Sequence, residues 1–398
     1  LTACATESTD DTAATTAEAG GDRSEPATEH SEGADDTAAT AQAADLRAGL
    51  NTLLAEHVFF AGAAVNEALQ GNTAGFEAAA GALDENSVAL SEAVGSVYGP
   101  EAGEAFLGLW RSHIGMFVDY TQATAAGDKA AQDKAVADLT GYANDFAVFL
   151  SGANPNLPEE TVEQLVVEHV VSTKDAVDAL ASGDAAKGFS EFREAIAHMH
   201  MIGDPLSAAI AQQFPEQFST GTSEAASALR TQLNVKLAEH VWLAGAAVNE
   251  AAKGNTAAFE AAAGALDGNS QDLAGMVGSV YGPEAGEAFL GLWRAHIGMF
   301  VDYTQGKLAG DDAKAAKAEQ DLAGYSRDFA VFLNGANDNL PVEDVQALLE
   351  EHVASTKGAI DAVVGGEGNP FVALREAGQH MSHIADPLAA AIATQQNL

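Results

Sequence analysis

Ten of the eleven histidines in this chain form two sets of five, one in each half, and four members of each set occupy matched positions. In each half, three of them follow one another at intervals of 56 residues, and the second set lies 183 residues after the first: His57, His113 and His169, then His240, His296 and His352. Each set has a fourth member, His198 or His380, and a looser companion, His200 or His383. Neutral imidazole is a common ligand of transition metals. The pattern therefore predicts one histidine-lined binding site in each half.

The spacing also predicts that the histidines of each half lie at one height in a bundle of helices. His57, His113 and His169 each precede a Gly-Asn or Gly-Asp pair by 14 residues, and His198 follows the last of these glycines by 15. Glycine commonly ends one helix, and Asn or Asp caps the next. At 1.5 Å per residue, every ring then lies about 21 Å from the same end of the bundle. The second half repeats this arithmetic, so all four histidines of each set are predicted to be metal ligands in one layer.

The elements that position these rings are predicted to be helical hairpins. Apolar residues recur at spacings of three and four, and strand signals are weak. The run Gly95–Arg111 recurs unchanged as Gly278–Arg294, so the two halves are repeats. The sequence therefore predicts an all-α protein of two tandem six-helix bundles, each of three αα-hairpins. These bundles cover residues 46–218 and 226–398, and a Pro/Ser/Thr/Gly-rich stretch over residues 214–223 joins them.

Four imidazoles in one buried layer need polar partners, because each unsatisfied buried polar group costs about 1–3 kcal/mol. One solution is a hydrogen-bond network with water and nearby side chains such as Thr173, and the other is a cation that takes three or four ring nitrogens. The returning helices are predicted to place further residues beside the rings: Asn86, Tyr142 and Met199, and in the second half Asn269, Tyr325 and Met381. The glutamates that precede the rings project about 100° away on a helix. They are predicted to face solvent or to lie just outside the layer: Glu56, Glu168, Glu239 and Glu351.

Three hypotheses about the function of this layer follow, two with a ligand and one without. All-nitrogen ligation with methionine nearby favours copper or zinc over calcium or magnesium, which prefer oxygen. The small residues 61–64 and 244–247 leave room for a flat cofactor, so haem with two axial histidines is the alternative. A third possibility is a structural or interaction module at the cell surface that binds no ligand and whose histidines only stabilise the core. The chain has no nucleophile elbow, P-loop, dinucleotide fingerprint or HExxH motif. An enzyme, in which zinc with an open fourth position activates water, is therefore only a distant fourth alternative, because no partnered base is visible.

Composition limits the partners. Lys and Arg number 18 against 58 Asp and Glu, for a formal net charge of −40. Such a field repels nucleic acid and anionic membrane surfaces, so neither is expected as a partner, and it attracts cations. The single cysteine excludes a disulfide scaffold and thiolate metal sites.

That cysteine stands in a suggestive context. Leu1-Thr2-Ala3-Cys4 is similar to a bacterial lipobox, in which the cysteine becomes lipidated. The acidic Ser/Thr/Ala/Gly run that follows predicts a disordered tether, so residues 1–45 form a lipobox remnant and a stalk. The expectation is an exported protein, lipid-anchored through Cys4 at the outer face of the bacterial cytoplasmic membrane or cell envelope.

Several motifs resemble an uncharacterised family of small bacterial exported helical-bundle proteins. These are the segments 109–114 (LWRSHI), 97–101 (VYGPE), 154–162 (NPNLPEETV) and 169–174 (HVVSTK). That family carries repeated L-W-x-x-H-[VI] helices and an L-T-K after the last histidine. The resemblance covers each unit, but the first hairpin has Leu54-Ala55-Glu56-His57 where the family often has Trp. The family has no settled activity, so the resemblance implies a fold and no function.

Overall fold

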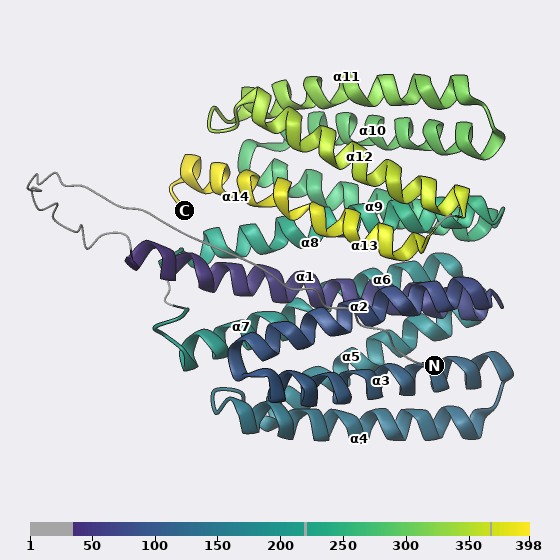
Figure 1. Ribbon diagram of the computed structural model, residues 1–398, viewed down its shortest axis with the longest axis vertical. Coiled ribbons are helices and arrows are strands. Elements are labelled where there is room, and N and C mark those ends of the chain that lie inside the picture. Colours follow the sequence, from purple (N-terminus) through teal and green to yellow (C-terminus); the bar gives the residue numbers. More distant parts are fainter. Residues whose placement is uncertain (1–34, 219–220, 367) are drawn as a thin grey trace, which may run out of the picture.

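The computed structural model describes residues 35–218, 221–366 and 368–398, and every regular element within these ranges is an α-helix (Figure 1). The helices are α1 Asp35–Leu69, α2 Thr73–Tyr98, α3 Pro100–Ala126, α4 Lys129–Ala153, α5 Glu159–Ala181, α6 Ala185–His198 and α7 His200–Gln213 in the first unit. The second unit has α8 Glu224–Ala252, α9 Thr256–Tyr281, α10 Pro283–Ala309, α11 Asp312–Ala336, α12 Val342–Gly365, α13 Pro370–His380 and α14 Ser382–Gln396. The all-α prediction is confirmed. Cys4 and most of the predicted tether lie outside the described residues.

The predicted Gly-Asn and Gly-Asp punctuation does separate the helices of each hairpin. Asn72, Asp128 and Asp184 each cap the following helix, and their side chains accept a hydrogen bond from a backbone N–H three residues later. Gly127, which ends α3, has φ +67°, a conformation that glycine adopts without steric cost. Each hairpin is therefore closed by short-range backbone chemistry that the sequence displays directly.

Helix α1 begins earlier than the sequence predicted. Residues 35–45 were expected to belong to a disordered tether, whereas the helix starts at Asp35. Alanine, which has the highest helix propensity, recurs between residues 38 and 44. The last part of this extension also has a packing partner, because Ala43 and Leu46 contact the apolar cluster around Ile210 and Phe218.

The sixth helix of each unit is interrupted at a methionine. Helices α6 and α7 are separated by Met199, and α13 and α14 by Met381. At each break one hydrogen bond tightens to span three residues: the Met199 N–H donates to the Ile196 carbonyl, and that of Met381 to Gly378. The returning helix therefore changes course just after His198 and His380, and this break affects where those histidines lie.

The first helices of the hairpins meet at the centre of each unit. Helices α1, α3 and α5 contact one another in the first unit, as do α8, α10 and α12 in the second. The units also share an interface, in which α1 packs against α8, α6 against α9, and α2 against α13. Figure 1 shows α1 and α8 lying in the middle of the molecule, with α3 and α4 at one end and α10 and α11 at the other.

Helix α1 is apolar on nearly every side because it contacts both units. By length and composition its segment Ala43–Leu69 would qualify as a membrane span, but 72% of the apolar window is buried inside the protein. A helix that is hydrophobic all round is typical of a central core position. The apolar character of α1 is thus explained by the packing of α1 against the helices of both units.

Candidate metal centre

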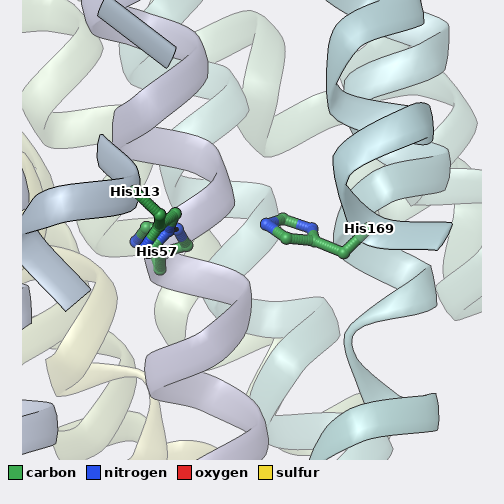
Figure 2. Close-up of side chains that lie close together, drawn as sticks. All are labelled: His57, His113 and His169. Carbon is green, nitrogen blue, oxygen red and sulfur yellow. Dashed lines mark hydrogen bonds between the residues drawn. The ribbon is translucent and has the colours of Figure 1, made fainter. Parts of the chain in front are cut away.

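Three histidines of the first unit converge in its core. His57 on α1, His113 on α3 and His169 on α5 are 2%, 3% and 6% exposed. The Nε2 atoms of His57 and His113 lie 3.3 Å apart, and the ring centroids of His57 and His169 lie 6.1 Å apart. Figure 2 shows the His169 ring pointing from its own helix toward the other two rings. One potential ligand atom from each ring lies within 4.8 Å of the others.

The second unit repeats this triad closely. His240, His296 and His352 are buried on α8, α10 and α12, and their potential ligand atoms also lie within 4.8 Å of one another. The Nε2 atoms of His240 and His296 lie 3.2 Å apart. The structure therefore brings together six of the eight predicted ligands, as two groups of three, and these groups can hold a metal ion.

Several ring nitrogens in the triads lack a hydrogen-bond partner. The Nδ1 atoms of His57 and His240 and the Nε2 atom of His352 are buried and unpaired. A weak bond joins His169 Nδ1 to Thr173 Oγ1 at 3.4 Å, and the matching pair in the second unit, His352 and Thr356, lies at 3.3 Å. If Nδ1 carries the proton and donates it to the threonine oxygen, Nε2 keeps its lone pair for a ligand.

Burial keeps the triad rings neutral. It lowers the pKa of His113 to about 3, and the nearby charge of His169 acts in the same direction. Burial is the main cause that lowers the pKa of His169 to about 4, and the nearby charge of His198 adds to the shift. Burial also lowers the pKa of His57 well below its ordinary value, and the charges of His113 and His169 add to that shift. In the second unit, burial lowers the pKa of His240 to about 3, and the nearby charge of His352 adds to the shift. All these rings are unprotonated at neutral pH, which is the state that binds metals.

The spacing of the nitrogens suits a tetrahedral ion. Zinc–nitrogen bonds are about 2.0–2.1 Å long, so two nitrogens on one tetrahedral ion lie about 3.3 Å apart. The observed Nε2 separations of 3.3 and 3.2 Å match this value. A pair of neutral imidazoles at that distance otherwise shares a single hydrogen. The ligand atom of the third ring lies within 4.8 Å of these two, and three donors on a tetrahedral ion leave a fourth coordination position open.

Aromatic rings hold the triads in place. In the first unit, Trp110 lies 4.7 Å from the His57 and His113 ring centroids, and Tyr142 stacks on His113 at 5.0 Å. Tyr325 stacks in the same way on His296 at 5.1 Å. The hydroxyl groups of both tyrosines are buried without a partner. The tyrosines thus lie beside the rings, as the sequence suggested, and contact them through their faces.

The other residues predicted to lie beside the rings divide into two groups. Met199 is buried and lines an apolar cavity of about 80 Å³ that His113 and His169 also line. Met381 occupies the matching cavity of about 110 Å³ in the second unit. Asn86 and Asn269 instead hydrogen-bond to Glu56 and Glu239, away from the triads. These two asparagines therefore donate hydrogen bonds to buried glutamates and not to the histidine rings.

The fourth histidine of each set is not part of its triad. His198 and His380 are half-buried at the ends of α6 and α13, immediately before the helix breaks. Each lies close enough to the third histidine of its unit for its charge to lower that residue's pKa. The prediction of a fourth ligand assumed a continuous returning helix, whereas the helix breaks at Met199 and Met381 and the fourth ring lies beside the third histidine, outside the group of three.

The triad of the first unit borders a second cavity that leads outward. A cavity of about 340 Å³ is lined by His57, His113 and His169, and it extends to Gly71 and Gln122 near the end of the bundle. The matching groove of the second unit, about 470 Å³, is lined by Phe259, Phe300 and their neighbours and by no histidine. The two triads therefore differ in their access, although their ligands match.

Two of the four glutamates beside the histidines do not face solvent. Glu56 and Glu239 are both 0% exposed and lie in the interface between the units. Glu56 pairs with Arg375 of the other unit. Glu239 accepts a hydrogen bond from Arg193 Nε at 2.9 Å. The second unit covers the face that the sequence predicts to be outside, whereas Glu168 and Glu351 are exposed as expected.

A second pair of buried glutamates was missed by sequence reasoning altogether. Glu67 on α1 and Glu250 on α8 are each 1% exposed, and both accept a hydrogen bond from Lys253. The only signal was that α1 and α8 are apolar all round, which implies that charged residues on any of their faces are buried.

No protein-family model, curated protein or solved structure matches this chain.

Proposed function

We propose that each unit binds one transition-metal ion, copper or zinc, through its three buried histidines. The observation that carries this proposal is the convergence of three neutral imidazoles in each unit: two of their nitrogens lie 3.2–3.3 Å apart, and a nitrogen of the third lies within 4.8 Å of both. Buried polar atoms are normally paired, and Nε2 of His352, whose Nδ1 lies near Thr356, has no partner and is therefore available to an ion. An ion that takes one nitrogen from each ring explains why polar side chains lie in an otherwise apolar core.

The charge of the surroundings favours copper in the +1 state. Among the described residues that line the two cavities of the first triad, none is acidic. The cost of burying an uncompensated ion rises steeply with its charge, so a monovalent ion is much less costly here than a divalent one. Zinc requires an anion such as hydroxide in its fourth position, and the cavity of about 340 Å³ offers space for one.

The same geometry argues against haem. Two axial ligands lie on opposite faces of the macrocycle. His57 and His113 have ring centroids only 5.2 Å apart and meet nitrogen to nitrogen. A porphyrin does not fit between rings in that contact.

Metal titration of the purified chain tests the proposal. Cu(I), presented anaerobically with a chromophoric competitor, is expected to bind at two equivalents per chain, more tightly than Zn²⁺. His113→Ala and His296→Ala are each expected to remove one equivalent of bound metal. His200→Ala, which changes an exposed histidine outside the triads, is expected to leave both equivalents bound. At 100 times its Kd the ion is expected to stabilise the fold by about 2.7 kcal/mol. Failure of both Cu(I) and Zn²⁺ to bind folded protein, or unchanged binding in His113→Ala, would leave the histidines a structural role only.

Export and lipid anchoring form the second part of the proposal, and they rest on the lipobox-like segment from Leu1 to Cys4. An acidic chain that gathers cations in its own field is suited to a position outside the membrane. In a bacterial host that lipidates exported proteins, the chain behind a signal peptide is expected in the membrane fraction with a diacylglycerol mass on Cys4. Cys4→Ala is expected in the soluble exported fraction, and an unchanged distribution would contradict the anchor.

A further inference from the structure

Three surface side chains of the second unit are arranged as metal ligands and belong to no triad. His380 ends α13, His383 lies one turn later on α14, and Glu351 lies on the neighbouring helix α12. One potential ligand atom from each lies within 4.8 Å of the others, and the two imidazole centroids are 4.8 Å apart. Glu351 and His383 are exposed and His380 is half-buried, so the group is open to solvent on one side.

The inner histidine of this group has an unpaired nitrogen. His380 Nε2 is shielded from solvent and has no hydrogen-bond partner. Oε2 of Glu351 approaches it to 3.7 Å, which is too far for a hydrogen bond. Ligand atoms around a tetrahedral zinc ion lie about 3.3 Å apart, so a small closure of the two side chains would place a cation between them.

The first unit lacks this group, although it has most of the same residues. The positions that match Glu351, His380 and His383 are Glu168, His198 and Met201. Met201 is 48% exposed, so a thioether takes the place of the second imidazole at the surface. His200, which precedes it, has its Nδ1 at the carbonyl of Ala197. Among the described residues, the first unit has no comparable surface group.

We propose that Glu351, His380 and His383 form a solvent-accessible site for a divalent cation of the zinc type, present in the second unit alone. Two imidazoles and one carboxylate, with an open fourth position, are a donor set that zinc takes in proteins. The carboxylate supplies the negative charge that the buried triads lack, so a divalent ion suits this site better than it suits them. The formal charge of −40 raises the local concentration of such cations.

Equilibrium dialysis with Zn²⁺ tests this site separately from the triads. The full chain is first loaded with Cu(I), dialysed against Zn²⁺, and then mixed with a chelator under anaerobic conditions. One equivalent of Zn²⁺ is expected to bind and to leave within seconds, because its site is exposed. His383→Ala and Glu351→Gln are expected to weaken it at least tenfold, whereas Met201→Ala, at the matching position of the first unit, leaves it unchanged.

A gain-of-function variant completes the test. Met201→His restores the missing imidazole beside Glu168 and His198, and it is expected to raise the fast-exchanging Zn²⁺ from one equivalent to two. The same measurements on chain without Cu(I) separate the two proposals, because this site does not depend on occupied triads. Absence of fast-exchanging Zn²⁺, or its retention in both His383→Ala and Glu351→Gln, would overturn the inference even if the triads bind copper.

Discussion

His113 meets His57 with the two Nε2 atoms 3.3 Å apart in the core of the first unit. The helices that carry them belong to different hairpins, 56 residues apart in the chain. Two neutral imidazoles in that position either share one hydrogen or turn both lone pairs toward a common ion. A protonated ring there would face a second ring and no carboxylate among the described residues that line the site. The consequences of this contact can be measured with and without metal.

The first prediction concerns acid stability. Four triad histidines have pKa values of about 3 or 4 in the folded protein: His113, His169, His240 and His352. The pKa of a histidine in the unfolded chain is about 6.5. Below about pH 6.5 the unfolded chain therefore binds protons that the native triads exclude. The free energy of unfolding is expected to fall as the pH drops from 6.5 to 4.5, by about 1.4 kcal/mol per pH unit for each such ring, and to be flat above this window.

Urea unfolding of metal-free protein at several pH values checks this prediction. Glu56, whose pKa burial raises against the opposing charge of Arg375, acts with the opposite sign, but it is a single group against six rings. Replacing one triad ring, as in His169→Gln, is expected to reduce the slope by about one proton. A free energy of unfolding that stays constant between pH 7 and 5 would mean that the rings are charged, or accessible to protons, in the native state.

The second prediction concerns the threonine beside the third ring. Thr173 Oγ1 lies 3.4 Å from Nδ1 of His169, where it can fix the ring's tautomer and orientation. Thr173→Val is expected to weaken metal binding in the first unit by about 10–100-fold, the usual effect of removing such a partner. The matched control is Thr121→Val, because Thr121 is equally buried but bonds to the Phe117 carbonyl. Competition titration measures both, and equal affinities in the two variants would contradict a role for Thr173 in orienting His169.

The third prediction concerns Tyr142, whose hydroxyl is buried without a partner while its ring stacks on His113. An unsatisfied buried hydroxyl costs about 1–3 kcal/mol, so Tyr142→Phe is expected to leave the metal-free protein as stable or more stable. Tyr120→Phe is the control, because its hydroxyl donates to Asp178 Oδ1 at 2.6 Å, and we expect it to lose about 1 kcal/mol. Thermal or urea unfolding compares them. A clear destabilisation by Tyr142→Phe would show that the hydroxyl has a partner in solution.

The sequence predicted the parts of this protein that local chemistry determines. The hairpins follow from glycine ends and Asn or Asp caps, such as Gly71 and Asn72, and the level of the triads follows from counting back from those ends. Counting residues did not predict correctly where the fourth histidine lies, because the helix break at Met199 depends on a single tightened hydrogen bond. A periodic apolar pattern continues across such a break, so nothing in it marks the change of course.

The interface between the units could not be predicted in the same way. Glu56 and Arg375 are 319 positions apart, and no spacing rule relates residues at that separation. A repeat predicts two similar units but does not say which of their faces meet. The sequence therefore placed Glu56 outside the histidine layer, which is correct, and near solvent, which the packing of α13 against α2 prevents.

The fourth prediction tests that interface through Arg375, whose Nε donates to Oε1 of Glu56. Arg375→Met would leave the carboxylate of Glu56 buried without a cation, and losing one partner of a buried pair costs about 3–5 kcal/mol. The control is Arg111→Met, because Arg111 pairs with Asp84 where both are about half exposed, and such pairs contribute about 0–1 kcal/mol. Adding Glu56→Leu to Arg375→Met removes the stranded charge, so the double variant is expected to recover most of the loss in urea unfolding. Equal stabilities for Arg375→Met and Arg111→Met would mean that the two units separate in solution and that Glu56 is hydrated there.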